Sequence, residues 1–229
     1  MAKVLITGAG GALGKACVTG FLEEGHDIIA ILSPGKELPY PTRSPISVYN
    51  ADLTDEMATR KVLEQVLEAH GPINIALLLV GGFAMGTIDT ADGAGIREMI
   101  RLNFETALYT ARPIFAHMMA QPNGGRIAFV GARPALDAKA GKGVVAYALS
   151  KTLVFKLAEL LNEEGKEKNV VSSVIVPSII DTPSNRKAMP KANTHHWVSP
   201  EAIAGIIRFA TSEKGAAMRE PIIKAYGNS

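Results

Sequence analysis

The sequence predicts one α/β domain, a doubly wound parallel sheet of about seven strands with helices on both faces. Short apolar runs rich in β-branched residues alternate along the chain with longer windows in which apolar residues recur every three or four positions. Such alternation is typical of parallel strands joined by right-handed helical crossovers. The 229 residues are 47% apolar, enough to bury one substantial core, and neither an internal repeat nor a linker divides them. Residues 1–229 are therefore expected to form a single domain.

Strands are expected at short apolar runs, and helices at the amphipathic windows between them. The expected strands are KVLIT (3–7), DIIAIL (27–32), ISVY (46–49), INIALLLV (73–80), RIAFV (126–130), VVSSVIV (170–176) and PIIKAY (221–226). The expected helices cover residues 12–24, 56–70, 95–119, 144–164 and 200–213. Two stretches rich in proline and polar residues, 33–45 and 181–200, are expected to be irregular. We expect the second to be a loop on the substrate side of a functional site.

The composition excludes several classes of function. Lysine and arginine number 24 against 22 aspartates and glutamates, and no long basic run occurs, so neither nucleic acid nor a membrane surface is an expected partner. The single cysteine, Cys17, excludes an internal disulfide framework and a multi-thiolate metal site. The apolar run IALLLV is too short to span a bilayer, and the strand pattern at MAKVLITG leaves no room for a signal peptide. We therefore expect a cytoplasmic protein.

The segment TGAGGALG, Thr7 to Gly14, lies directly between the first expected strand and the first expected helix. Glycines allow the backbone to turn tightly and to approach a pyrophosphate, whose charge the N–H groups at the start of the helix stabilise. The alternative is a simple strand-to-helix turn, but such a turn seldom needs four glycines in seven residues. The segment therefore predicts a Rossmann-like site for a dinucleotide.

Tyr147 and Lys151 are four residues apart in an expected helix, so both side chains lie on one face. Reduction of a C=O or C=N bond needs a hydride and a proton, and a nearby ammonium group would stabilise the phenolate of a proton-donating tyrosine. The alternative is a partly buried tyrosine beside a surface lysine. The position of the pair after the fifth expected strand, in a chain that opens with a dinucleotide turn, favours a catalytic role.

These motifs together resemble the short-chain dehydrogenase/reductase family, with Ala12 at the position of the middle glycine of its Thr-Gly motif. The resemblance implies that Asn103, in IRLNFET, bends its helix and holds a water in the proton relay; it could instead be an ordinary polar surface residue. It also implies that Asp52, in ADLTD, holds the adenine, although an aspartate there could simply cap the next helix.

The cofactor contacts implied by this resemblance come from six segments. They are Thr7, Gly8, Gly11, Ala12, Leu13 and Gly14; Ser33 and Lys36; Asp52 and Leu53; Val80, Gly81 and Gly82; Tyr147 and Lys151; and Pro177, Ile180 and Thr182. After the second strand, Leu32 and Ser33 replace the acidic residue that would select NAD(H), and Lys36 and Arg43 follow. NADP(H) is therefore favoured over NAD(H). The alternative is that both cations only keep an exposed loop solvated.

Most members of the family have a serine thirteen residues before the tyrosine, and Pro134, which cannot donate a hydrogen bond, occupies this position. Either the protein is a non-catalytic NADP(H)-binding sensor, or its substrate needs less polarisation than a ketone. The second reading is supported by a resemblance to the quinoid dihydropteridine reductase branch, which also lacks the serine. VGGF (80–83), VGARPALDAKAG (130–141) and DTPSNRKAMPKA (181–192) carry this resemblance, with Phe83 where that branch has a tryptophan.

The resemblance implies hydride transfer from NAD(P)H to a small conjugated acceptor such as a quinonoid dihydropterin; a general carbonyl or 3-oxoacyl ketoreductase is the alternative enzyme. The candidate substrate contacts are Phe83, Arg133, Tyr147 and Trp197. No metal site is expected at His195 and His196, since no third ligand has suitable spacing. By the same resemblance, residues 95–119 and 142–164 are expected to be the subunit contacts of a homodimer or homotetramer.

Overall fold

The computed structural model describes residues 1–41, 46–219 and 221–227, so the predicted role of Arg43 lies outside the described residues. Within these ranges seven parallel strands form one sheet, in the order β3-β2-β1-β4-β5-β6-β7. The strands are β1 (Lys3–Thr7), β2 (Asp27–Leu32), β3 (Ile46–Asn50), β4 (Ile75–Leu78), β5 (Gly125–Val130), β6 (Val170–Pro177) and β7 (Ile222–Ala225). The predicted doubly wound sheet is therefore confirmed, and every expected strand is present to within two residues at each end.

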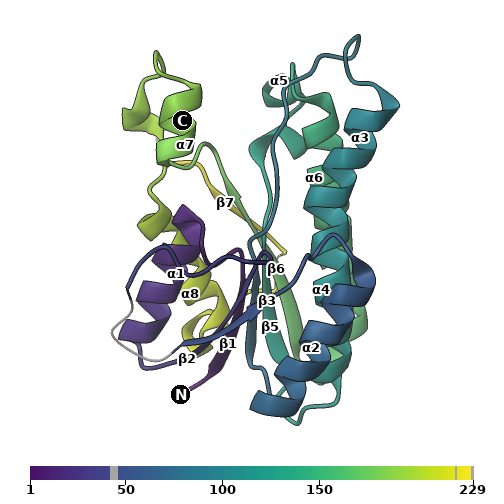
Figure 1. Cartoon of the computed structure of the whole chain (residues 1–229), viewed down its shortest axis with the longest axis vertical. Coiled ribbons are helices and arrows are strands. Elements are labelled where there is room, and N and C mark those ends of the chain that lie inside the picture. The colour runs from purple at the N-terminus through teal and green to yellow at the C-terminus, as the bar shows by residue number, and fades with distance from the viewer. Residues whose placement is uncertain (42–45, 220, 228–229) are drawn as a thin grey trace.

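Helices cover both faces of this sheet (Figure 1). On one face, α1 (Ala12–Glu23) and α8 (Pro200–Thr211) bury residues such as Phe21 and Ile207 against the strands. On the other face lie α2 (Glu56–His70), α4 (Thr106–Met119) and α6 (Val145–Gly165), which contribute residues such as Leu63, Ile114 and Phe155. Because both faces are covered, the central strands are mostly apolar, as the continuous runs predicted, although β6 includes the buried Ser172 and Ser173.

The order of the strands reverses between β1 and β4, which pair in register from Val4–Ile75 to Thr7–Leu78. Chain connections run to opposite sides from this point, so the loops after β1 and β4 leave a crevice at the carboxyl ends of the strands. The glycine turn and the segment VGGF follow these two strands directly. Both motifs that were singled out in the sequence therefore begin at the switch point.

The expected helix at 95–119 is interrupted. Residues Gly93–Ile100 form α3, residues Arg101–Glu105 form a π-helical turn, η1, and α4 follows. A π turn inserts one extra residue into the helix and changes the direction of its side chains. Here it turns Asn103 into the interior, where only 1% of the residue is exposed. The prediction that the helix is irregular at Asn103 is confirmed.

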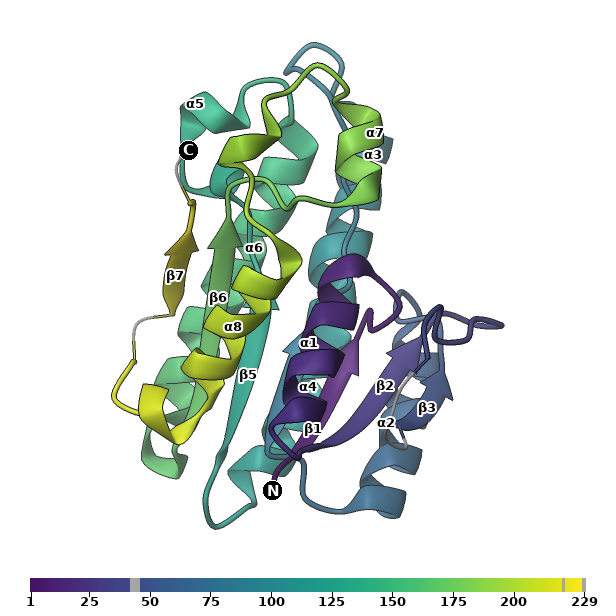
Figure 2. The same cartoon turned by 90° about the vertical axis from the view of Figure 1, so that its left-hand side faces the viewer.

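The expectation that residues 181–200 are irregular throughout is wrong. Thr182 accepts a hydrogen bond from the Asn185 N–H, Pro183 occupies the first turn, and α7 (Pro183–Ala188) follows. The short 3-10 turn η4 (Thr194–His196) comes next, and Ser199 caps α8 through the Ala202 N–H, as the sequence predicts. Together with α5 (Ala138–Gly141), α7 lies beyond the carboxyl ends of the strands (Figure 2).

The remaining short elements are 3-10 turns, η2 (Arg133–Ala135) after β5, η3 (Lys166–Lys168) after α6 and η5 (Glu213–Gly215) after α8.

Candidate active site

The glycine turn is shaped by the close approach of its two ends. A Cβ on Gly14 would lie 2.2 Å from the Gly8 carbonyl oxygen, so only glycine fits there. Gly8 itself has φ of +69°, and its carbonyl accepts a hydrogen bond from the Gly11 N–H at 3.0 Å. No side chain in the described part of the chain caps α1, whose first turn also has no acidic residue. The first N–H groups of α1 are therefore left to meet an anion.

Ala12 is exposed, so its methyl group is accommodated where the family pattern has glycine. Thr7, in contrast, is buried. Its hydroxyl donates to the Leu77 carbonyl and accepts from the Leu79 N–H. Thr7 thus joins the ends of β1 and β4 on the two sides of the crevice. This structural role was not part of its prediction as a cofactor contact.

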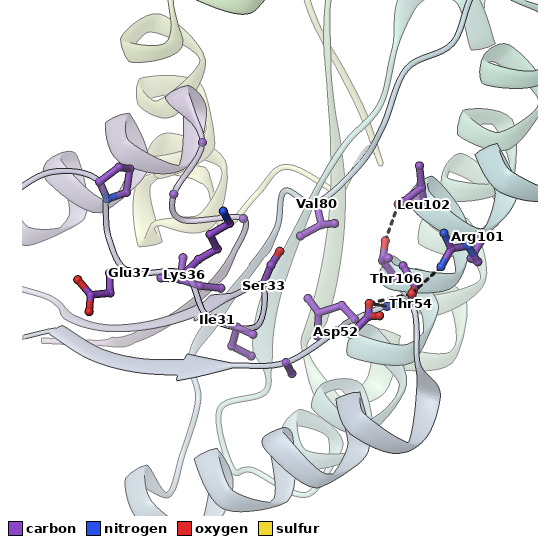
Figure 3. Close-up of a pocket in the computed structure, with 17 residues that line it drawn as sticks. Ile31, Ser33, Lys36, Glu37, Asp52, Thr54, Val80, Arg101, Leu102 and Thr106 are labelled. Atoms are coloured by element: carbon purple, nitrogen blue, oxygen red, sulfur yellow. Dashed lines mark hydrogen bonds between the residues drawn. The ribbon is translucent and has the colours of Figure 1, made fainter.

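A pocket of about 550 Å³ opens beside the glycine turn (Figure 3). Its wall includes many of the predicted cofactor residues, namely Gly8, Gly11, Ser33, Lys36, Asp52, Leu53 and Val80. Residues outside the predicted set of cofactor contacts also line it: Gly10, Ile31, Leu32, Glu37, Pro39, Ala51, Thr54, Arg101, Leu102 and Thr106. Segments far apart in sequence thus form one cavity at the switch point.

The other predicted cofactor residues are not part of this wall. Leu13 is buried in the core behind the turn. Pro177 ends β6, and the Ile180 carbonyl accepts a hydrogen bond from Asn185. Thr182 caps α7. Ile180 and Thr182 belong to the segment between β6 and α8.

Asp52 does not cap α2, so that alternative is wrong. Asp55 is the capping residue, and its carboxylate accepts from the Ala58 N–H. Asp52 instead accepts two hydrogen bonds from Thr54, from its N–H at 2.9 Å and its hydroxyl at 2.7 Å. The hydroxyl bond, then the backbone bond, lowers the pKa of Asp52, so the side chain is a carboxylate at neutral pH.

The loop after β2 is held by Asn50, whose amide donates to the Ser33 and Lys36 carbonyls. Lys36 is exposed and lines the pocket. Glu37, which the sequence reasoning did not weigh, lines it too, and Figure 3 places Glu37 on the side of Lys36 away from Asp52. The cation predicted to face a 2′-phosphate therefore has an acidic neighbour in the same loop.

Asn103 is the centre of a buried network. Its Oδ1 accepts from the Gly82 N–H at 3.0 Å, and its Nδ2 donates to the Gly82 carbonyl at 3.0 Å and to Ser150 Oγ at 3.1 Å. A Cβ on Gly81 would lie 2.6 Å from Asn103 Oδ1 and 3.2 Å from Lys151 Nζ. This lack of space accounts for a glycine in VGGF. The reading of Asn103 as an ordinary surface residue is wrong.

Ser150 was missed by the sequence reasoning. It is fully buried, and besides accepting from Asn103 it donates to the Tyr147 carbonyl at 2.8 Å. It therefore connects the asparagine to the backbone of the tyrosine. The signal was its position: Ser150 immediately precedes Lys151, and helical spacing places it one turn after Tyr147.

Tyr147 and Lys151 have pKa values set by burial. Burial lowers the pKa of Lys151 to about 8, and its ammonium group donates to the Val130 carbonyl at 2.8 Å. Burial raises the pKa of Tyr147 to about 12. Burial shifts this pKa in the direction opposite to the one expected from the neighbouring Lys151 ammonium, because a buried phenolate loses its hydration.

The segment after β4 packs against the start of the helix that carries Tyr147. The Phe83 ring is 61% exposed and meets the Tyr147 ring edge-on, with 5.0 Å between ring centroids. Gly86 donates its N–H to the Gly143 carbonyl at 2.7 Å and accepts from the Val145 N–H at 2.9 Å. The candidate substrate residue Phe83 and the candidate proton donor are thus in contact, held by backbone pairing.

The other candidate substrate residues lie at the carboxyl ends of β5 and β6. Arg133 forms an ion pair with Asp137 at 3.5 Å, and its guanidinium group lies 5.0 Å from the centroid of the Tyr226 ring. Pro134 follows in η2, so this position offers no hydroxyl group. Trp197 is half-buried, next to the exposed His195 and His196. Among the described residues, no group of three or more potential ligands is arranged to hold a metal ion.

A family model described as short chain dehydrogenase matches residues 2–193. The chain belongs to the short-chain dehydrogenase family. It is accordingly an oxidoreductase of the short-chain dehydrogenase/reductase type, a family that uses nicotinamide cofactors. In the described ranges, no helix has both the length and the apolar character needed to cross a membrane.

Two similar members of the short-chain dehydrogenase family have assigned activities. The 3-oxoacyl-(acyl-carrier-protein) reductase FabG of Thermotoga maritima is 22% identical, over 97% of this chain and 95% of that protein. The dihydropteridine reductase of Dictyostelium discoideum is 26% identical, over 88% of this chain and 84% of that protein. The resemblance to the dihydropteridine reductases noted in the sequence is confirmed at this level of identity.

Solved structures agree with this membership. A short-chain type dehydrogenase/reductase from Mycobacterium ulcerans superimposes with a TM-score of 0.89 at 20% identity, covering 99% of this chain and 89% of that one. The structure of ElxO with NADP bound gives a TM-score of 0.89 at 18% identity, covering 97% and 96%. At this identity the likeness establishes the fold.

Proposed function

We propose that this protein transfers a hydride from NADPH to a small, flat, conjugated acceptor such as a quinonoid dihydropterin. The observation that carries the proposal is the edge-on contact of the exposed Phe83 ring with the Tyr147 ring, beside a β5 loop that has Pro134 in place of a hydroxyl donor. An aromatic face holds a flat conjugated molecule well. An acceptor already activated by its own conjugation does not need a second donor to polarise it.

In this proposal each site residue has a separate role in the reduction. A reduced nicotinamide held in the crevice would supply a hydride, that is, both electrons and one proton, to one atom of the acceptor's polarised bond. Tyr147 gives its hydroxyl proton to the neighbouring atom, so the acceptor gains two electrons and two protons in all. Lys151 lies one helical turn away, and its ammonium form stabilises the phenolate that remains. Asn103 and Ser150 fix the backbone around this pair through Gly82 and the Tyr147 carbonyl.

Preference for NADP(H) over NAD(H) is part of the proposal. Lys36 and Ser33 line the pocket where an acidic residue would be needed to hold a ribose 2′-hydroxyl. The Lys36 ammonium supplies a charge for a 2′-phosphate, and Glu37 lies on the side of Lys36 away from Asp52 (Figure 3). Competition of NADPH and NADH for the purified protein measures the preference, and equal affinities would contradict it.

The experiment that tests the reaction compares Tyr147→Phe with the wild type in oxidation of NADPH by quinonoid dihydropterin. Loss of the proton donor is expected to lower turnover by about 10²–10⁴-fold, since general acid catalysis contributes about this much. Tyr109→Phe is the matched control, because Tyr109 lies on α4, is only partly buried and does not line the pocket. Turnover of Tyr147→Phe equal to that of the wild type would overturn the proposal.

A general ketoreductase is the second candidate, favoured by the match of 97% of the chain to the 3-oxoacyl reductase of Thermotoga maritima. Under that reading Pro134→Ser should raise ketone turnover by supplying the missing donor. Under the pterin reading it should leave pterin turnover unchanged. A protein that binds NADPH but oxidises it with neither acceptor would be the sensor.

We also propose that the protein forms a homodimer or homotetramer in the cytoplasm. Leu149, Leu153 and Leu160 lie on one stripe of α6 and are 51%, 37% and 54% exposed. Such a stripe is typical of a surface covered by another subunit. Light scattering of the purified protein measures the mass, and a monomer at micromolar concentration would contradict this part.

A further inference from the structure

A chain of hydrogen bonds crosses from the η1 turn to the loop after β3, at the wall of the pocket (Figure 3). Glu98 accepts from Nε and Nη2 of Arg101, each at 2.9 Å. Arg101 Nη1 donates to Thr54 Oγ1 at 2.8 Å, and Thr54 Oγ1 donates to Asp52 Oδ1 at 2.7 Å. We call these four residues, Glu98, Arg101, Thr54 and Asp52, the clasp.

The clasp fixes one oxygen of Asp52 and leaves the other available. Oδ1 accepts both the Thr54 hydroxyl and the Thr54 N–H, which defines the plane of the carboxylate. No hydrogen bond from the described residues reaches Oδ2. Asp52 lines the pocket, and the two bonds from Thr54 keep it ionised. The clasp therefore presents an anionic acceptor of fixed orientation to whatever occupies the pocket.

Arg101 also lines the pocket, but its geometry does not suit it to bind a phosphate. Nε and Nη2 are used by Glu98 and Nη1 by Thr54, so all three nitrogens already have acceptors. The adjacent carboxylate of Glu98 also compensates its charge. Arg101 thus acts on the pocket through Thr54, whose hydroxyl must donate to Asp52 because it accepts from Arg101.

We infer that Thr54 and Arg101 are positioning residues that orient Asp52 to accept the exocyclic amino group of the cofactor's adenine. The place of the adenine beside Asp52 is what the family resemblance implies, so the inference rests on the proposed cofactor binding. Its own content is that the bonds from Thr54 and Arg101 set the orientation in which the carboxylate favours an amino group over a carbonyl oxygen. A carbonyl there would face the carboxylate oxygen with no proton between them. The Asp52 carboxylate therefore selects a base that carries an amino group at this position.

The test compares the affinities of NADPH and its hypoxanthine analogue, in which a carbonyl oxygen replaces the amino group, by fluorescence titration. The wild type is expected to bind NADPH about tenfold more tightly, the size of one hydrogen bond to a charged acceptor. Thr54→Val keeps the shape but removes the hydroxyl, and should reduce the ratio to about threefold or less. Arg101→Leu should give an intermediate ratio.

Two matched variants separate orientation from general damage. Thr54→Ser keeps the hydroxyl group and should restore the wild-type ratio. Arg112→Leu removes a different arginine–glutamate pair, with Glu56 at 3.0 Å, which joins α4 to α2 away from the pocket wall and should keep the ratio. A merely structural loss would weaken both cofactors equally and leave the ratio unchanged.

A wild-type ratio retained in Thr54→Val would overturn the inference while leaving the proposed function intact. A wild-type protein that binds neither cofactor would instead overturn the proposed function and this inference with it. The two failures are therefore distinguishable in one set of titrations.

Discussion

Asn103 and Arg101 are two positions apart in the η1 turn, yet they anchor networks in very different surroundings. Asn103 is 1% exposed and bonds to Gly82 and Ser150 in the interior, whereas the Arg101 side chain is 45% exposed and bonds to Glu98 and Thr54 at the pocket wall. A buried polar group without its partner has no water to replace it, while an exposed one does. The comparison separates bonds that stabilise the fold from bonds that only direct a side chain.

The largest effect on stability is expected for Asn103→Leu. The N–H and the carbonyl of the partly buried Gly82 and the hydroxyl of the fully buried Ser150 would all lose a partner, so we expect the free energy of unfolding to fall by about 3 kcal/mol. Urea unfolding measures it. Ser150→Ala should cost only about 1 kcal/mol, because Asn103 keeps its two bonds to Gly82. Equal losses in the two variants would contradict the central place of Asn103.

Lys151→Met should change stability in the opposite direction. The pKa of Lys151 is lowered from 10.5 to about 8, so below pH 8 the folded protein carries a buried ammonium that the unfolded chain holds in water. This penalty, about 3 kcal/mol, falls away as pH rises from 8 to 10.5. After loss of the bond to Val130, the variant should be about 2 kcal/mol more stable than wild type at pH 7.

At pH 10.5 the gain in Lys151→Met should have disappeared, because the lysine is then neutral in the folded wild type. Urea unfolding of both proteins at the two pH values gives the difference. A gain of the same size at both would show that packing, and not the charge, is responsible. Oxidation of NADPH should be lost in the variant at either pH.

The smallest effect on stability is expected for Arg101→Leu. Its partner Glu98 is as exposed as Arg101 is, and water and salt screen such a pair. The urea midpoint should therefore stay at the wild-type value, in contrast to that of Asn103→Leu. A clear loss of stability would mean that the clasp holds α3 in place and does not serve orientation alone.

The strands and most helices were predictable because their signal is local. Strands such as β4 and β6 are buried along their whole length and mostly apolar, so their short apolar runs were visible in the sequence. The η1 turn was accessible only through the resemblance that identified Asn103. Residues 181–200 were harder, since a helix as short as α7 has few turns in which periodicity can appear, and its capping by Thr182 and Pro183 was the available signal.

In the candidate site, motifs predicted the residues that follow strands, and missed those brought there by packing. Arg101 and Thr54 meet only because the π turn faces the loop after β3, a contact across 47 positions of sequence. Burial raises the pKa of Tyr147, an effect that the sequence could not reveal because it follows from the packing around the side chain. Whether Tyr147, Lys151 and the other site residues act as proposed stays a prediction.

The start of α6 depends on the segment after β4, because Gly86 forms backbone hydrogen bonds with Gly143 and Val145. Val144 provides no side-chain cap, and the N–H of Val145 is satisfied by the Gly86 carbonyl. Tyr147 is only the third residue of that helix. A ligand that displaces the segment containing Phe83 and Gly86 would therefore weaken the first turn of α6 and move the Tyr147 hydroxyl. Binding of the acceptor and the position of the proton donor are thus coupled.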